Sequence, residues 1–78
     1  MAFSIEDMDY IEKLLKSADE GLSIDQLLIQ LHMPITNYNR IILLSQLKWN
    51  AKITINYLKL DSKKVITIFK IVEKITNQ

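Results

Sequence analysis

The sequence predicts one small α+β domain in which three helices precede a β-hairpin. Apolar residues recur at helical spacing up to about residue 49, and β-branched residues dominate from residue 52 onward. A Ser or a Pro stands where each helix should begin. With 78 residues, 49% of them hydrophobic, and only one Gly and one Pro, the chain has room for one packed core. We therefore expect a single domain over residues 1–78.

The first helix is expected to begin after Ser4, whose side chain can accept a hydrogen bond from a backbone N–H of the first turn. Phe3 and Met8 are spaced as a hydrophobic staple, and acidic residues fill the first turn. Gly21 is expected to end the segment, because glycine readily takes the left-handed conformation of a helix C-terminus. The apolar stripe comprises Met8, Ile11, Leu14, Leu15 and Ala18.

Two further helices are expected before residue 50. Ser23 to Gln26 forms a capping box for a short second helix, which ends in a turn at His32 before Pro34. Pro34 suits the first turn of a third helix that runs to about Trp49. At 100° per residue, its buried face is expected to comprise Tyr38, Ile41, Ile42, Ser45 and Trp49. The two aromatic residues of this face are therefore expected to lie in the core and not to stack on bases.

Residues 52–72 are typical of an antiparallel hairpin with lysines at its tip. Residues 52–60 alternate at first and are rich in β-branched residues, 61–64 form a polar turn, and 65–72 are again rich in β-branched residues. The apolar set changes parity between Tyr57 and Leu58, which indicates a bulge. Apolar residues from Val65 to Ile75 also fit a helical stripe, so a short C-terminal helix is the alternative for residues 65–76.

The net charge of +1 conceals a division between the two parts of the chain. Residues 1–26 carry seven acidic residues and two lysines, a net charge of −5. Residues 27–78 carry eight basic and two acidic residues, a net charge of +6. Such a division indicates that one face meets a polyanion and another is kept away from it.

The order of helix, short helix, tight turn, longer helix and hairpin resembles the winged helix-turn-helix DNA-binding family. Residues 21–27 resemble the entry into that family's second helix, and 36–42 resemble the start of its recognition helix. Residues 31–34 lie where the family usually has Leu-Gly-aliphatic-Ser. His32 replaces the usual turn glycine, and Pro34 replaces the usual capping serine.

The resemblance implies that the third helix enters the major groove and that the hairpin touches the DNA backbone or the minor groove. Near base edges or phosphates it places Thr36, Asn37, Asn39 and Arg40. For phosphate neutralisation it implies Lys48, Lys52, Lys63 and Lys64. These cations would have to gather beside the amino end of the third helix. The expected function is a double-stranded-DNA-binding, homodimeric regulator of transcription, or a maintenance factor of a plasmid or viral genome.

Three leucines, Leu43, Leu44 and Leu47, conflict with a third helix that reads DNA, because a helix in a DNA groove should not be apolar all round. Either the first helix or the C-terminal segment covers them, or they form a homodimer or partner interface. The alternative function is a non-enzymatic protein-interaction module of the same shape that docks through these leucines. It includes a phage-type inhibitor whose acidic first helix binds a basic site on a host protein.

Catalysis is not expected, because the chain has one His, no Cys and no glycine-rich phosphate loop. His32 is expected to be a turn residue, and no metal, cofactor or small-molecule substrate is expected. The longest apolar run, residues 41–44, is far shorter than the roughly 20 residues that cross a bilayer. The acidic N-terminus lacks the positive charge of a signal peptide. We therefore expect a cytoplasmic protein, inside a host cell if it is viral.

Overall fold

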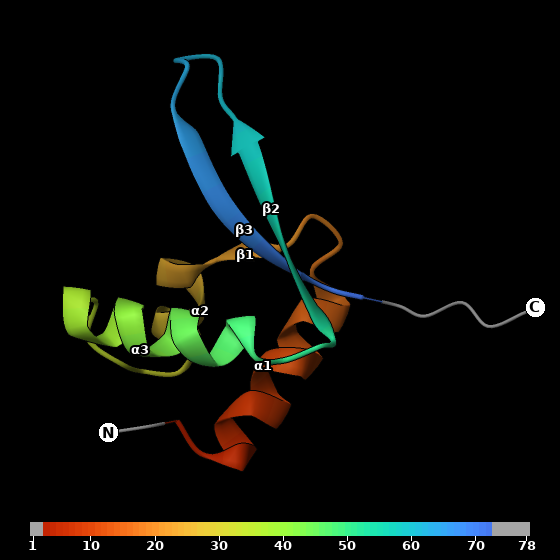
Figure 1. Cartoon of the computed structure of the whole chain (residues 1–78), viewed down its shortest axis with the longest axis vertical. Helices are drawn as coiled ribbons and strands as arrows, with labels where there is room; N and C mark the ends of the chain where they lie inside the picture. The colour runs from red at the N-terminus through yellow and green to blue at the C-terminus, as the bar shows by residue number, and fades with distance from the viewer. Residues whose placement is uncertain (1–2, 73–78) are drawn as a thin grey trace, which may run out of the picture.

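The computed structural model describes residues 3–72 and shows a small α+β architecture within them (Figure 1). Three helices and a three-stranded antiparallel sheet of order β1-β3-β2 make up this part of the chain. In chain order the elements are α1 (Ile5–Ser17), β1 (Leu22–Ser23), α2 (Ile24–Gln30), α3 (Asn37–Lys48), β2 (Ile53–Lys59) and β3 (Val65–Ile71). The hairpin formed by β2, β3 and their loop projects away from the helices.

Both predicted serine N-caps are confirmed. The Ser4 hydroxyl accepts a hydrogen bond from the Asp7 N–H at 3.0 Å, and the Asp7 carboxylate accepts one from the Ser4 N–H at 3.0 Å. Ser23 and Gln26 make the same reciprocal pair at 3.2 and 2.8 Å. Two otherwise unpaired N–H groups are satisfied at each helix start, which fixes where α1 and α2 begin.

The predicted start of the third helix is wrong by about two residues. Helix α3 begins at Asn37, and its N-cap is Thr36, whose hydroxyl accepts a hydrogen bond from the Asn39 N–H at 3.1 Å. Pro34 lies before the cap and not in the first turn. Proline suits a first turn only because it lacks an N–H that would have no partner there. The Thr36 hydroxyl instead accepts a hydrogen bond from an N–H of the first turn, which stabilises the helix start.

The turn between α2 and α3 places His32 in the left-handed region, with φ of +59°. Its N–H donates to the Ile29 carbonyl at 3.0 Å, and the Met33 N–H donates to the Leu28 carbonyl at 2.9 Å. This pair of bonds is the Schellman motif, which usually has glycine at the left-handed position. The prediction that His32 is a turn residue is confirmed.

The hairpin has an uninterrupted register. Partners run from Ile53 opposite Ile71 to Lys59 opposite Val65, so the predicted bulge is wrong and Leu58 lies on the opposite sheet face from Tyr57. Residues 65–71 form a strand, which confirms the hairpin and shows the helical alternative to be wrong for them. Residues 73–76 of that alternative lie outside the described residues. The two-residue strand β1 was not predicted, because a dipeptide carries no periodicity.

Gly21 was expected to end the first helix, but it lies beyond the end of α1 and against β3. Helix α1 ends at Ser17 with Ala18 as its C-cap, and Gly21 follows with φ of +84°. A Cβ there would lie 2.8 Å from the Phe69 carbonyl oxygen. Glycine therefore lets the connection into β1 approach the backbone of β3.

The core corrects the predicted orientation of α3. Leu43 and Leu47 are fully buried, whereas Tyr38, Ile41 and Trp49, which we expected in the core, are 61%, 64% and 89% exposed. Ser45, another of the expected core residues, is also exposed, and Ile42 is only partly buried. The buried cluster comprises Phe3, Ile11, Leu15, Leu27, Leu28, Leu43, Leu47, Ile53 and Phe69. The side of α3 that carries Leu43 and Leu47, which was expected to face away from the core, therefore packs against it.

We predict that His32→Gly raises the free energy of unfolding by about 0.5–1 kcal/mol. Glycine removes a left-handed penalty of roughly 1–2 kcal/mol but loses about 0.5–1 kcal/mol through greater freedom of the unfolded chain. Urea unfolding measures the difference. The control Gln30→Gly, at the last residue of α2, should instead lower stability, by less than the roughly 1 kcal/mol that glycine costs in a helix interior. A His32→Gly protein less stable than the wild type would contradict the turn geometry.

Candidate nucleic-acid interface

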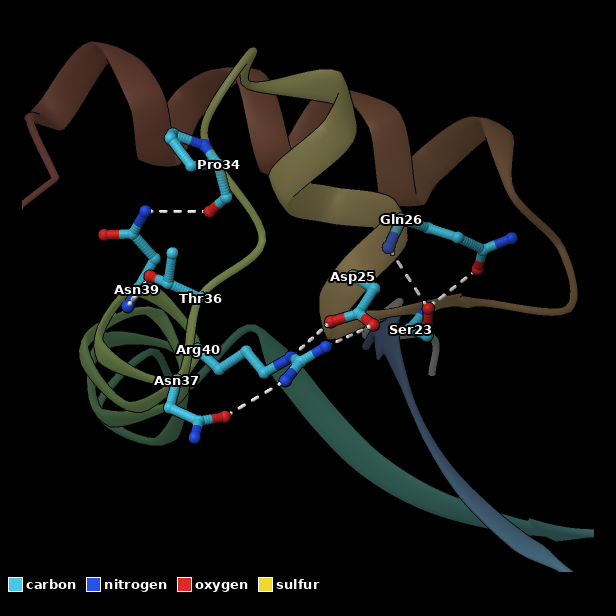
Figure 2. A network of polar contacts seen from close by, with 8 residues as sticks. All are labelled: Ser23, Asp25, Gln26, Pro34, Thr36, Asn37, Asn39 and Arg40. Atoms are coloured by element: carbon cyan, nitrogen blue, oxygen red, sulfur yellow. Dashed lines mark hydrogen bonds and ion pairs between the residues drawn. The ribbon is translucent and has the colours of Figure 1, made fainter.

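The amino end of α3 is joined to the start of α2 by Arg40 and Asp25 (Figure 2). Arg40 Nε donates to Asp25 Oδ1 at 2.8 Å, and Nη2 donates to Oδ2 at 3.0 Å. A third donor, Nη1, bonds to the Asn37 side-chain oxygen at 3.1 Å. The guanidinium is thus held in a bidentate pair, the geometry in which arginine binds carboxylates and phosphates best.

This pair shifts both ionisation equilibria toward the charged forms. The hydrogen bond from Arg40 lowers the pKa of Asp25. Burial opposes this effect, and the attraction of the opposite charge adds to the lowering. The hydrogen bond to Asp25 raises the pKa of Arg40 in the same way. The two side chains remain about 40% exposed, at 41% and 42%, so the pair lies at the surface and is screened by solvent.

Other polar residues predicted to contact DNA also bond to their own chain. Thr36 caps α3 through its hydroxyl, and Asn39 Nδ2 donates to the Pro34 carbonyl at 2.8 Å. Asn37 accepts from Arg40. The structure therefore brings Thr36, Asn37, Asn39 and Arg40 together, as expected, but it uses their polar atoms to define the turn before α3 and the start of the helix.

The predicted cations do not gather beside the amino end of α3. Lys48 lies in the last turn of this 12-residue helix, which is about 18 Å long, at the opposite end from Arg40. Lys52 follows the helix, and its Nζ lies 3.6 Å from Glu12 Oε1 of α1. Lys63 and Lys64 lie in the hairpin loop. The expected single cationic surface is therefore divided among three places.

Charge is nevertheless separated along the molecule. The segment 4–21, which contains α1, has six acidic residues and two lysines, a net charge of −4. The segment 52–72, which contains the hairpin, has five lysines and one aspartate, a net charge of +4. Figure 1 shows α1 at the lower end of the longest axis and the hairpin loop at the upper end. The lysines at the far end of the hairpin, Lys59, Lys63 and Lys64, are thus separated from α1, whereas Lys52 and Lys70 of the same segment lie beside α1.

A groove lies between α3 and the hairpin, with a volume of about 330 Å³. Its apolar wall includes Ile41, Leu44 and Ile55, and its polar groups include Arg40, Lys48, Tyr57 and Thr67. Sequence reasoning missed Ile41 and Tyr57 as surface residues. Tyr57 shares a sheet face with the buried Ile53. It is exposed because the hairpin extends beyond the helices that cover this face near Ile53.

Burial within the chain removes Leu43 and Leu47 from the predicted dimer or partner interface, and leaves Leu44 at the edge of the groove. Leu43 and Leu47 are fully buried in the same cluster as Ile11 and Leu15 of α1. Leu44 is partly buried and lines the groove. Of the two explanations that the sequence left open, cover by the chain itself is the one observed for Leu43 and Leu47.

The described residues 3–72 include no helix long and apolar enough to cross a membrane. Within the same range, no group of three or more His, Cys, Asp or Glu residues is placed to hold a metal ion. No protein-family model, curated protein or solved structure matches the chain. The site must therefore be interpreted from its own residues.

We predict that Asp25→Asn lowers the urea midpoint at neutral pH, because it leaves Arg40 without its charged partner. The lowered pKa of Asp25 means that its contribution is present above the unfolded-state pKa and is lost as the pH falls through the folded-state value. The difference between wild type and variant should therefore shrink below about pH 4. Asp9→Asn, on the exposed side of α1, is the matched control and should leave the midpoint unchanged. A difference that is independent of pH would contradict this account.

Proposed function

We propose that this chain is a winged-helix protein that binds double-stranded DNA, in regulation of transcription or in maintenance of a plasmid or viral genome. The hairpin is the wing, and in this proposal it provides most of the electrostatic attachment. The observation that carries the proposal is the net charge of +2 on residues 59–64, at the end of the hairpin that lies opposite the acidic α1. A polyanion is attracted to one end and repelled from the other, which orients the encounter.

The order of elements supports the winged-helix assignment. Helix, short strand, two helices and a hairpin follow one another as α1, β1, α2, α3, β2 and β3, and β1 pairs with β3 of the wing. The resemblance found at residues 21–53 implied this order of helices and hairpin. The tight turn at His32 supports it as well, because its Schellman geometry sets the angle at which α3 leaves α2.

The corrected surface changes the expected role of α3. Arg40 is held by Asp25, and the exposed side of α3 carries Tyr38, Ile41 and Trp49, with Lys48 as a cation in its last turn. Contacts to phosphates from lysines position a protein on DNA but carry little sequence information. We therefore propose that the attachment is mainly to the backbone, through the lysines of the wing.

We predict that Lys63→Asn with Lys64→Gln weakens binding to every duplex sequence to a similar extent. Each lost phosphate contact should flatten the plot of log affinity against log salt by about one unit, so two should flatten it by about two. Asn is chosen because Lys63 has φ of +68°, which asparagine tolerates. Mobility-shift titrations of random duplex at several salt concentrations measure the slope.

The matched control is Lys13→Gln with Lys16→Gln, which removes the same charge from two exposed lysines of the acidic α1. We expect its salt slope to equal that of the wild type. Equal losses for both double variants would show that only net charge matters and would contradict attachment through the wing. Binding that does not depend on salt would contradict the proposal altogether.

A second candidate, a protein-interaction module, is favoured by the outer side of α3. Tyr38, Ile41 and Trp49 follow one another there at helical spacing and are all more than 60% exposed, at 61%, 64% and 89%. Exposed apolar side chains gathered on one face are typical of an association surface. In this candidate the homodimer forms through this face, and the buried leucines take no part.

For this candidate we predict that Trp49→Gln converts a dimer to a monomer, because the most exposed of these side chains then loses its apolar contact area. Light scattering over a concentration series measures the mass. Ile29→Gln, at an exposed position of α2, is the control and should stay dimeric. A wild type with the mass of one chain at all concentrations rules this candidate out as a homodimer.

A further inference from the structure

Tyr57 is placed unusually for an aromatic residue on the core face of a sheet. Ile53, Ile55, Tyr57 and Lys59 alternate onto the same face of β2. Ile53 is 8% exposed and Ile55 partly buried, but Tyr57 is 73% exposed because the helical layer ends before it. The ring therefore stands at the mouth of the groove between α3 and the hairpin.

The groove joins an apolar wall to cationic groups on both of its sides. Lys48 contributes an ammonium from α3, and Arg40 lies eight residues earlier, about 12 Å along the helix axis. On the hairpin side, Lys59 follows Tyr57 on the same face, about 7 Å closer to the loop. The lysines of the loop, Lys63 and Lys64, come next. Cations thus continue from the groove to the end of the hairpin.

From this arrangement we infer that the groove binds a single-stranded segment of nucleic acid, with an unstacked base against the ring of Tyr57. Proteins that bind single strands combine a positive track for the backbone with aromatic rings for the bases. The volume of about 330 Å³ is at the small end of ligand pockets, which span about 300–1,000 Å³. Lys48 and Lys59 hold the phosphates on either side of the base.

This inference rests on the proposed nucleic-acid function and specifies a second substrate form for it. In a duplex the base faces are stacked on one another, so a duplex leaves Tyr57 and the apolar wall formed by Ile41, Leu44 and Ile55 uncovered. An unpaired base covers both while its phosphates meet the lysines. An acidic peptide matches the charge alone, and the row of lysines continuing to the loop favours a ligand with regularly repeated negative charge.

The test measures fluorescence anisotropy of labelled oligothymidine of about 15 nucleotides, within the site sizes of single-strand binders, and of a duplex of about 15 base pairs. We expect Tyr57→Ala and Tyr57→Leu to weaken oligothymidine binding by about 5- to 150-fold, the effect of losing one stacked base. Tyr57→Phe should bind as the wild type does. Duplex binding should change by less than about twofold in all three variants.

Tyr10→Ala is the matched control, because Tyr10 is an exposed tyrosine on the acidic α1. It should leave binding of both nucleic acids unchanged. Thermal unfolding by circular dichroism checks that each variant is folded. If Tyr57→Ala proves unfolded, Tyr57→Leu still tests the site, because it keeps an apolar residue in the strand.

The outcomes separate this inference from the proposed function. Oligothymidine binding that Tyr57→Leu and Tyr57→Ala leave intact overturns the base site, whereas duplex binding that depends on Lys63 and Lys64 still supports the wing. Polyglutamate that binds as tightly as oligothymidine, with the same loss in Tyr57→Leu, overturns the base site in favour of an acidic peptide. Failure of both nucleic acids to bind at low salt overturns the inference and the proposed function together.

Discussion

The burial of Leu43 and Leu47 determines which surfaces this small domain presents. These leucines, four residues apart, bring α3 against α1, α2 and the sheet. Their burial fixes the rotation of α3 about its axis, and with it the direction in which every other side of the helix faces. The side with Leu44 and Lys48 then borders the groove, and the side with Trp49 faces solvent. Each leucine in a core of this size stabilises the fold by about 2–5 kcal/mol relative to alanine. Burial of these leucines therefore outweighs the preference of polar residues on the same stripe for water, and those residues must find hydrogen-bond partners at the edge of the core.

Arg40 is the residue most affected by this constraint. It lies three residues before Leu43 on the same stripe, so its side chain extends along the inner edge of α3 toward α2 and not toward the outer side. A guanidinium placed there lies within hydrogen-bond distance of the start of α2. Asp25, in the first turn of α2, supplies both carboxylate oxygens. The same pair therefore completes the contact between the two helices and neutralises, at the surface, a cation that the sequence had assigned to DNA.

The features that could be predicted from the sequence are those set by neighbouring residues. Ser4 and Ser23 form their capping boxes within four residues, and the β-branched residues after Lys52 form the hairpin. The rotation of α3 could not be predicted in this way, because apolar residues occur on all its sides. Its polar residues misled the interpretation: Thr36 and Asn39 are satisfied by the helix start, and Arg40 by Asp25, so their side need not face water. Likewise Tyr57 alternates as a core residue, and only the reach of the hairpin beyond the helices, a tertiary property, exposes it.

The separation of charge and the engagement of Arg40 together limit how such a domain can bind a polyanion. Lysines of the hairpin are available without rearrangement and give a salt-dependent attachment with little sequence preference. A sequence-reading contact from Arg40 requires a phosphate or a guanine to replace Asp25 as its bidentate partner. Because both side chains of that pair are about 40% exposed, at 41% and 42%, solvent screens it and exchange of partners is feasible once the polyanion is already attached. In the proposed function, attachment through the hairpin therefore comes before any reading by α3, since only an attached polyanion would bring a competing acceptor close enough to displace the carboxylate.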